Sequence, residues 1–257
     1  SAAALQAETL EAIDRQLRDT PHDRSLLAAK GAMQRQGHDY EGAIVTYETL
    51  LALDPDDARA RNLLAMVLHK AAQNTEGKDA LEQLRQAVAL APDADLLKPA
   101  YLEAAHATGT ASELIEAYES LSQGYEVPAP LLVAVADAYR DVGKPAAAAT
   151  LYRSVLDIVP ADADAGLGLA LALLDAERHA DALDSIQATI SLNPNQPMLL
   201  LARAAIQWQS GARVPALDTF DAILDIDPDN ADAVNLKAQL LCDMGCLSLS
   251  QDLVAAH

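Results

Sequence analysis

A small residue followed four positions later by a large one recurs along the chain. The pairs are Ala43 and Tyr47, Ala80 and Leu84, Ala148 and Tyr152, Ala182 and Ile186, and Ala216 and Phe220, with Leu114 and Tyr118 as a variant. Residues four positions apart lie on the same face of an α-helix. The pattern therefore predicts a series of similar helices that pack against similar neighbours.

Prolines divide the chain at nearly constant spacing. Intervals of 34 residues separate Pro21 from Pro55, Pro160 from Pro194, and Pro194 from Pro228. Pro92 interrupts the series, because it lies 37 residues after Pro55 and 68 residues, twice 34, before Pro160. A glycine precedes the second helix in several intervals, at Gly37, Gly109, Gly143, Gly211 and Gly245. Proline ends a helix and glycine suits a turn, so each interval is predicted to hold a helix, a turn, a second helix and a proline-marked turn.

The segment from Leu132 to Pro160 matches a known helix-pair pattern. The pattern W-x2-L-G-x2-Y, then A-x3-F, then P of the tetratricopeptide repeat is matched by Leu132, Val135, Ala136, Tyr139, Ala148, Tyr152 and Pro160. The chain therefore resembles a tetratricopeptide repeat array, although it lacks the first-helix Trp and has Lys30 and Leu102 at the small-residue position. The resemblance implies an all-α fold, a right-handed α-solenoid of stacked helix hairpins.

The resemblance also gives a repeat map, with residues 1–257 forming one superhelix. A leading helix is expected at 2–20, followed by units near 23–57, 58–94, 95–128, 129–162, 163–196 and 197–230 and a partial unit at 231–257. Asp and Asn beside the prolines, as in LDPDD, LNPNQ and IDPDN, are expected to cap the following helices. The weakest joint is expected at 122–130, where two prolines and a glycine interrupt the helical pattern. The insertion at 71–79 is expected to lengthen an exposed turn.

Composition supports helices and limits the partners. Hydrophobic residues make up 51% of the 257 residues but aromatic residues only 4%, which favours helices built from Ala and Leu over a β-sandwich or barrel. The net charge of -20 repels phosphate, so nucleic acid is not expected as a partner. No stretch approaches eighteen uncharged apolar residues, so a membrane-embedded segment is not expected, and the opening residues do not match a signal peptide.

In tetratricopeptide arrays the first helix of each pair lines an inner groove that binds peptides. The resemblance therefore implies that the N-terminal half presents a basic and amide-rich strip: Arg24, Gln34, Arg35, Arg59, Asn62, Met66, His69 and Lys70. Such a strip could hold a carboxylate-bearing peptide through charge-assisted hydrogen bonds. Solvation, or pairing with nearby acids, is the alternative. Met66 stands where the second Asn of the family's terminal-carboxylate clamp is expected, so binding of chaperone tails is not supported.

The C-terminal half of the groove is expected to be apolar. Its first helices would present Val133, Leu167, Leu171, Leu174, Met198, Leu201 and Trp208, with Asp137, Arg140 and Asp175 beside them. Exposed apolar strips and tryptophan are typical of interaction sites. Trp208 is expected to contact a partner or a second copy of the chain. The alternative is that most of these leucines pack against the following repeat and that Trp208 makes no such contact.

Catalytic and metal-binding patterns are missing from the sequence. The six histidines lack the HExxH spacing of zinc proteases, and GLG at 166–168 lacks both a third glycine and a preceding strand. Cys242 and Cys246 have no second ligand pair, which makes packing residues a better interpretation than a zinc site. We therefore expect no enzyme activity, cofactor or metal.

Two functions remain open from the sequence. The first is an interaction scaffold that binds a protein or peptide in its groove. The second is the soluble part of a polysaccharide export machine, because residues 113–156 and the stretch GLALALLDAERHADAL resemble the periplasmic repeats of bacterial poly-N-acetylglucosamine export porins. The resemblances suggest a bacterial protein of the cytoplasm or the periplasm. Self-association through the C-terminal unit, with Leu240, Leu247, Leu249 and Leu253, is a further expectation.

Overall fold

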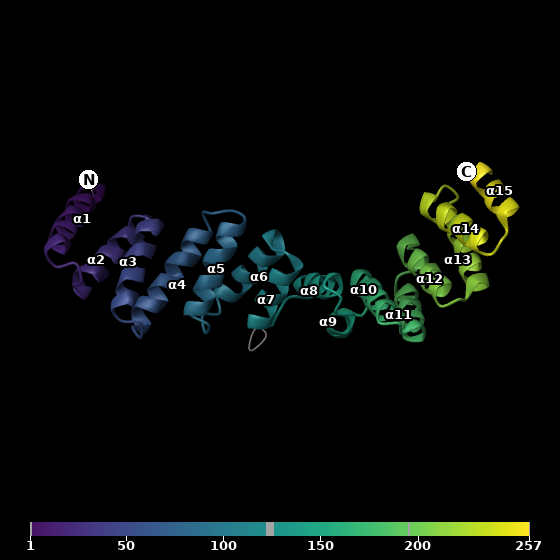
Figure 1. Cartoon of the computed structure of the whole chain (residues 1–257), viewed down its shortest axis with the longest axis horizontal. Helices are drawn as coiled ribbons and strands as arrows, with labels where there is room; N and C mark the ends of the chain where they lie inside the picture. Colours follow the sequence, from purple (N-terminus) through teal and green to yellow (C-terminus); the bar gives the residue numbers. More distant parts are fainter. Residues whose placement is uncertain (1, 122–125, 195, 257) are drawn as a thin grey trace. The chain divides into compact units, whose positions relative to one another are not determined.

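The chain folds into two compact units, Ser1–Val127 and Pro128–His257. The computed structural model describes residues 2–121, 126–194 and 196–256. These residues contain fifteen α-helices and no β-strand (Figure 1). None of the helices in the described ranges combines the length and hydrophobicity that a bilayer span requires.

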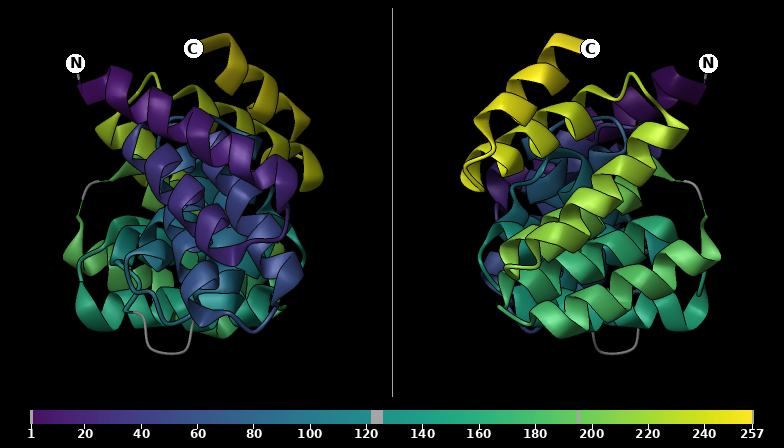
Figure 2. Two further views of the ribbon diagram at one scale, coloured as in Figure 1. Left: turned by 90° about the vertical axis from the view of Figure 1, so that its left-hand side faces the viewer. Right: turned by 90° about the vertical axis from the view of Figure 1, so that its right-hand side faces the viewer.

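The N-terminal unit begins with a lone helix that is followed by three helix pairs. Its helices are α1 (Ala2–Asp19), α2 (Arg24–Gln36), α3 (Tyr40–Leu53), α4 (Ala58–Ala72), α5 (Lys78–Leu90), α6 (Leu97–Thr108) and α7 (Ala111–Leu121). Each helix packs on the next one along the chain, and Figure 2 shows this unit end-on at the left. The insertion after α4 forms the connection to α5, where residues 73, 74 and 76 are exposed as expected.

The C-terminal unit contains four helix pairs. Its helices are α8 (Ala129–Asp141), α9 (Pro145–Ile158), α10 (Ala163–Asp175), α11 (His179–Leu192), α12 (Pro197–Gln209), α13 (Arg213–Ile226), α14 (Ala231–Asp243) and α15 (Leu247–Ala256). Successive helices again pack on one another, and α10 also contacts α8 and α12. The segment 231–257, expected as a partial unit, thus contributes both helices of a pair.

The recurring pairs of small and large residues form the core of both units. Ala43, Tyr47, Ala148, Tyr152, Ala182, Ile186, Ala216 and Phe220 are all fully buried. The expectation about Lys30 was wrong, because the adjacent Gly31 takes the small-residue position. A Cβ atom at Gly31 would lie 2.8 Å from the Tyr47 ring, whereas Lys30 forms an ion pair of 2.7 Å with Asp14.

Prolines and capping side chains set the helix boundaries. Helix α9 ends two residues before Pro160, and α3, α5, α11 and α13 end at the same distance from their prolines. The predicted caps are confirmed at Asp57 and Asn230, whose side chains accept hydrogen bonds from backbone amides at the starts of α4 and α14. In LNPNQ, the N-cap of α12 is Gln196, which makes no side-chain capping bond; Asn195 lies outside the described residues.

The predicted break in the stack coincides with the division between the units. The boundary between Val127 and Pro128 falls inside the 122–130 stretch, of which residues 122–125 lie outside the described residues. The helices on either side, α7 and α8, end at Leu121 and begin at Ala129. That the chain forms one superhelix therefore stays a prediction.

Glu177→Gly should stabilise the C-terminal unit by about 1 kcal/mol. Glu177 lies in the turn after α10 and has a φ of 59°, in the left-handed region. Gly211, at the same position of the next helix pair, has a φ of 82°. A side chain is disfavoured in this conformation, and Glu177 is exposed. The midpoint of urea unfolding, followed by the fluorescence of Trp208, measures the gain.

Gly211→Ala is the matched control for this substitution. No described atom lies within 4 Å of a Cβ added at Gly211, so the substitution changes only the backbone preference. It should lower the midpoint by about as much as Glu177→Gly raises it. An unchanged or lower midpoint for Glu177→Gly would show that Glu177 is not strained.

Candidate functional site

An exposed stripe runs along one face of α4 in the N-terminal unit. Arg59, Asn62, Met66 and Lys70 follow one another at intervals of three and four residues, which places them on the same face of the helix. All four are exposed, and Met66 leaves 53% of its surface accessible. The stripe borders two hollows, one on each side of α4.

The first hollow, which we call the apolar hollow, has a volume of about 660 Å³. Asn62, Met66, His69 and Lys70 line it from α4, and Leu90, Leu96 and Leu97 line it from α5 and α6 and the connection between them. Leu96 is 72% exposed. Exposed Met66 and Leu96 thus offer apolar surface around a recess that could accept the apolar side chain of a partner.

His69 lines the apolar hollow but is itself buried. Only 7% of its surface is exposed, and its Nδ1 atom has no hydrogen-bond partner among the described residues. Burial, and to a smaller extent the charge of Lys70, lowers the pKa of His69. The imidazole is therefore neutral near pH 7, and the cations at this site are the lysine and arginine side chains.

The second hollow, which we call the cationic hollow, has a volume of about 340 Å³ and lies between α2, α3 and α4. Arg24, Arg35 and Arg59 line it together with Ala32 and Tyr47. Tyr47 is fully buried. Burial raises the pKa of its hydroxyl, and the charges of Arg35 and Arg59 oppose that rise. The hydroxyl therefore keeps its proton and can donate a hydrogen bond.

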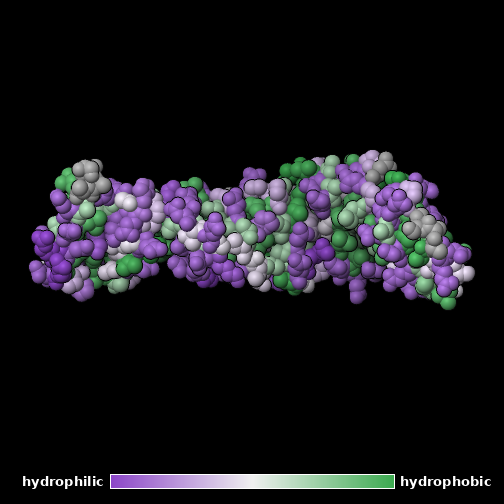
Figure 3. Space-filling model, turned by 90° about the horizontal axis from the view of Figure 1, so that it is seen from above, coloured by the Kyte–Doolittle hydropathy of each residue, from purple (hydrophilic) through white to green (hydrophobic). Residues whose placement is uncertain are grey.

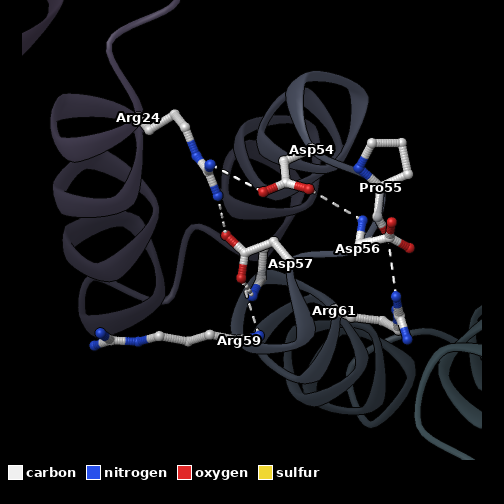
Figure 4. Close-up of polar contacts among 8 residues, drawn as sticks. Arg24, Asp54, Pro55, Asp56, Asp57, Arg59 and Arg61 are labelled. Atoms are coloured by element: carbon white, nitrogen blue, oxygen red, sulfur yellow. Dashed lines mark hydrogen bonds and ion pairs between the residues drawn. The ribbon is translucent and has the colours of Figure 1, made fainter.

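Arg24 forms ion pairs with two acids, Asp57 of the cationic hollow and Asp54 beside it. Its guanidinium lies 2.9 Å from the Asp54 carboxylate and 2.7 Å from that of Asp57. Asp57 also accepts hydrogen bonds from the amides of Arg59 and Ala60, and these contacts lower its pKa. Figure 4 shows Arg24 pointing toward both acids, whereas the Arg59 side chain extends away from them. Arg24 thus fits the expected alternative of pairing with nearby acids.

Arg35 and Arg59, unlike Arg24, have no acidic partner among the described residues. Neither guanidinium forms an ion pair with a described residue, and Nε of Arg35 is buried without a hydrogen-bond partner there. Gln34, expected in the same strip, is buried and accepts a 2.7 Å hydrogen bond from Thr46. Gln34 thus serves the packing of α2 on α3, and the unpaired positive charge of the hollow comes from Arg35 and Arg59.

Comparison with protein families identifies the architecture. A tetratricopeptide repeat model matches residues 134–197 and 167–231, and a TPR repeat model matches residues 31–71. The chain is a tetratricopeptide repeat protein. Matches in both units agree with the helix pairs of the fold, and the resemblance seen in the sequence is confirmed. No curated protein matches the sequence.

Solved structures share the fold of this tetratricopeptide protein at low sequence identity. The Naa15/Naa10 complex bound to HypK-THB aligns with a TM-score of 0.61 and 14% identity over 90% of this chain, which spans 36% of that chain. The type IV pilus biogenesis factor PilW has a TM-score of 0.50 and 18% identity, with 83% of this chain and 97% of PilW covered. A TPR repeat-containing protein from Cytophaga hutchinsonii has a TM-score of 0.50 and 16% identity, with coverages of 90% and 93%. These likenesses show the fold alone.

The apolar residues expected in the C-terminal part of the tetratricopeptide groove are mostly half-buried or buried. Trp208 and Leu201 pack against a buried cluster that includes Phe220 and Leu240. Leu174 is buried, whereas Leu167 and Leu171 are half-buried. Leu201 and Trp208 thus take part in the packing of α12 with α13 and α14. In Figure 3 hydrophilic side chains cover much of the N-terminal unit, and hydrophobic ones gather over parts of the C-terminal unit.

The polar residues expected beside this strip have partners within this tetratricopeptide chain. Asp137 accepts a hydrogen bond from the hydroxyl of Tyr152, and Nε of Arg140 donates to Asp175 over 3.0 Å. Burial, followed by the hydrogen bond to Asp137 and its charge, raises the pKa of Tyr152. Asp137 is thus engaged by Tyr152, and Asp175 by Arg140.

The sequence missed Tyr47, Leu90, Leu96 and Leu97 as residues of the site. Tyr47 was assigned only a packing role because it belongs to the pattern of small and large residues. The leucines lie at the end of α5, before α6 and at its start, outside the first-helix strip from which the groove was predicted. No group of three or more His, Cys, Asp or Glu residues within the described ranges is arranged to hold a metal ion.

Proposed function

We propose that this protein is a non-catalytic scaffold that binds a segment of a partner protein along α4 in its N-terminal unit. The observation that carries the proposal is the exposed stripe from Arg59 to Lys70, bordered by a cationic and an apolar hollow. Membership of the tetratricopeptide family supports an interaction scaffold, because such arrays present extended binding surfaces. The site then offers one recess for a charged side chain and one for an apolar side chain.

The chemistry of the site supports binding over catalysis. Arginine does not lose its proton in proteins, so Arg35 and Arg59 can hold an anion but cannot shuttle protons. Asp57 is held by Arg24 and by two backbone amides. His69 is buried, and the side chains that line the apolar hollow with it include no serine, threonine or cysteine nucleophile. These groups fit recognition of a partner.

Met66→Ala should weaken binding of a selected peptide about tenfold or more, because an exposed apolar side chain beside a recess is typical of a binding hot spot. Peptides are selected from a random display library on the immobilised 257-residue chain. Their affinities are then measured by fluorescence anisotropy on the wild-type protein and the variant. Removing Met66 takes apolar contact from the partner and leaves the core intact, because the side chain is 53% exposed.

Met198→Ala is the matched control. Met198 is 64% exposed and lies on α12 of the C-terminal unit, so it has the same chemistry at a different place. We expect this variant to bind with wild-type affinity. Equal affinity for both variants would remove α4 from the binding surface, and a library that yields no binding peptide would contradict the scaffold proposal itself.

The alternative of a polysaccharide export component is less well supported. A sugar ring stacks on an accessible aromatic face, but the single tryptophan, Trp208, is half-buried against the core cluster of α12 to α14. We therefore expect the emission of Trp208 to stay unchanged on titration with glucosamine oligomers. A saturable change in emission would favour the alternative.

A further inference from the structure

The chain contains two equivalent arrangements of a buried tyrosine and an arginine. Tyr47 and Arg35 in the N-terminal unit stand 105 residues before Tyr152 and Arg140 in the C-terminal unit (152 − 47 and 140 − 35). Both tyrosines are fully buried. Their surroundings can therefore be compared residue by residue.

In the C-terminal unit two acids serve as hydrogen-bond partners of the tyrosine and the arginine. Asp137, on the same helix as Arg140, accepts the hydrogen bond of the Tyr152 hydroxyl. Asp175, on α10, lies 3.0 Å from Nε of Arg140. The hydroxyl and the guanidinium thus each have a carboxylate partner supplied by the chain.

In the N-terminal unit neither of the two equivalent positions carries an acidic residue. The residue equivalent to Asp137 is Ala32, and the residue equivalent to Asp175 is Lys70. Within the described part of the chain, no hydrogen bond of regular geometry reaches Oη of Tyr47 or Nε of Arg35, and the hydroxyl's polar contact with the Arg35 side chain supplies no carboxylate acceptor. A buried polar group without a partner is destabilising. The small side chain of Ala32 lines the cationic hollow, where the carboxylate would be.

The other charges of the hollow favour an incoming anion. Arg59 brings a second guanidinium from α4 that forms no ion pair with a described residue. The acids nearby, Asp54 and Asp57, are engaged by Arg24. Two cations therefore surround a buried hydroxyl donor on a chain whose net charge is -20, which makes this hollow an unusual local site for a carboxylate.

We propose that a carboxylate of the bound partner enters the cationic hollow and takes the place that Asp137 occupies in the C-terminal unit, accepting a hydrogen bond from Tyr47 and pairing with Arg35 and Arg59. This inference rests on the proposed function and names the chemistry of the partner as an acidic protein segment. Arg59 and Met66 lie seven residues apart on α4, or about 10 Å at 1.5 Å per residue. An extended segment with an acidic residue about three positions from an apolar one would reach both hollows.

The first test asks whether the chain's own carboxylate can replace that of the partner. Ala32→Asp reproduces the arrangement of the C-terminal unit, so we expect it to reduce binding of the selected peptides at least about tenfold. It should not lower the urea midpoint of the N-terminal unit, followed by the NMR signals of α2 to α4. Arg35→Gln should also reduce binding about tenfold. Wild-type affinity in both variants would overturn the inference.

A pair of tyrosine variants separates binding from folding. Tyr47→Phe removes a hydroxyl that has no partner in the described structure, so it should weaken peptide binding several-fold, by about the worth of one hydrogen bond to a charged group. It should leave the urea midpoint of the N-terminal unit, followed by the NMR signals of α2 to α4, unchanged or higher. Tyr152→Phe removes a hydroxyl bonded to Asp137, so it should lower the midpoint of the C-terminal unit and leave binding unchanged. A purely structural role for Tyr47 predicts no loss of affinity, and that result would contradict the inference.

Small carboxylate compounds test whether the partner's carboxylate comes from a side chain or from a chain terminus. The arginine Nε–Hε signals of the 257-residue chain are followed by NMR during addition of N-acetylglutamate α-amide, which has one side-chain carboxylate, and N-acetylalanine, which has one terminal carboxylate. Saturable shifts of the Arg35 and Arg59 signals are expected for one or both probes. The neutral N-acetylglutamine α-amide should cause no such shifts. The probe that binds with the higher affinity indicates whether the partner supplies a side-chain or a terminal carboxylate. Arg213, on α13, is the control for non-specific pairing, and shifts that are equal at Arg213 would overturn the inference.

The two proposals fail in different ways. If Met66→Ala weakens peptide binding while Ala32→Asp and Arg35→Gln do not, the scaffold function stands and the carboxylate site is wrong. If the probes shift Arg35 and Arg59 but no peptide binds, the hollow accepts a carboxylate and the function as a protein scaffold is wrong.

Discussion

Phe220→Ala is expected to lower the free energy of unfolding of the C-terminal unit by about 3 to 5 kcal/mol. Phe220 is fully buried at the second helix of a pair, where Leu200, Ala216, Ile223 and Leu240 form a cluster with it. Truncation removes the ring from this cluster and leaves a cavity between α12, α13 and α14. The loss combines the transfer free energy of the ring with the cost of the cavity.

The effect should be confined to the C-terminal unit, because repeats contact only their neighbours. Trp208 packs against the same cluster, so its fluorescence follows the unfolding of this unit in urea. Hydrogen exchange then compares the units. Amides of α12 to α14 should lose protection by about two to three orders of magnitude, the equivalent of 3 to 4 kcal/mol, whereas those of α2 to α4 keep theirs.

Val214→Ala provides the control for Phe220→Ala. Val214 lies on the same helix, α13, but is 61% exposed, so its truncation should change stability by no more than about 0.5 kcal/mol. A small loss for Phe220→Ala, or equal losses of protection in both units, would contradict a core built separately within each unit.

Gly168→Leu is expected to destabilise the C-terminal unit by about 3 kcal/mol through overpacking. Gly168 lies within α10, where an added Cβ atom would come within 2.4 Å of two ring carbons of Tyr152. The ring is fully buried and its hydroxyl is bonded to Asp137, so it cannot easily move aside. The glycine thus allows α10 to approach α9 closely.

A double-mutant cycle with Tyr152→Ala tests this contact. The leucine would fill part of the space that the ring leaves, so the double variant should lose clearly less stability than the two single variants together. Ala146→Leu, at an exposed position of α9, should be close to neutral. Additive losses in the cycle would show that Gly168 and Tyr152 do not compete for space.

The sequence predicted the helix pairs well because their determinants are local. A small residue four positions before a large one identifies the buried face, as the full burial of Ala148 and Tyr152 shows. Proline cannot donate the next backbone hydrogen bond, so the end of α9 near Pro160 could be predicted as well. The turn glycines were less informative, since Gly37 has a φ of -82° and the next residue, His38, takes the left-handed conformation.

The candidate site could be predicted only in part. Spacing on α2 and α4 indicated Arg35, Arg59 and Met66, but not which arginine is paired, because the partners of Arg24 come from the connection between two other helices. Tyr47 lacks a carboxylate partner because Ala32, on its own helix pair, stands where Asp137 stands in the C-terminal unit, and Arg35 lacks one because Lys70, on the next pair, stands where Asp175 stands. The packing of Trp208 against the core could not be predicted either, because the sequence alone does not tell which face of a helix contacts the following pair.

The most direct test of the proposed binding site is an NMR titration of the isotope-labelled 257-residue chain with a selected peptide. The account predicts saturable shifts of amides and side chains on α2 and α4 and at the start of α6, including the Nε–Hε signals of Arg35 and Arg59. It also predicts that these shifts disappear when amides replace the carboxylates of the peptide. Shifts centred on α10 and α12, or shifts that persist with the neutral peptide, would contradict it.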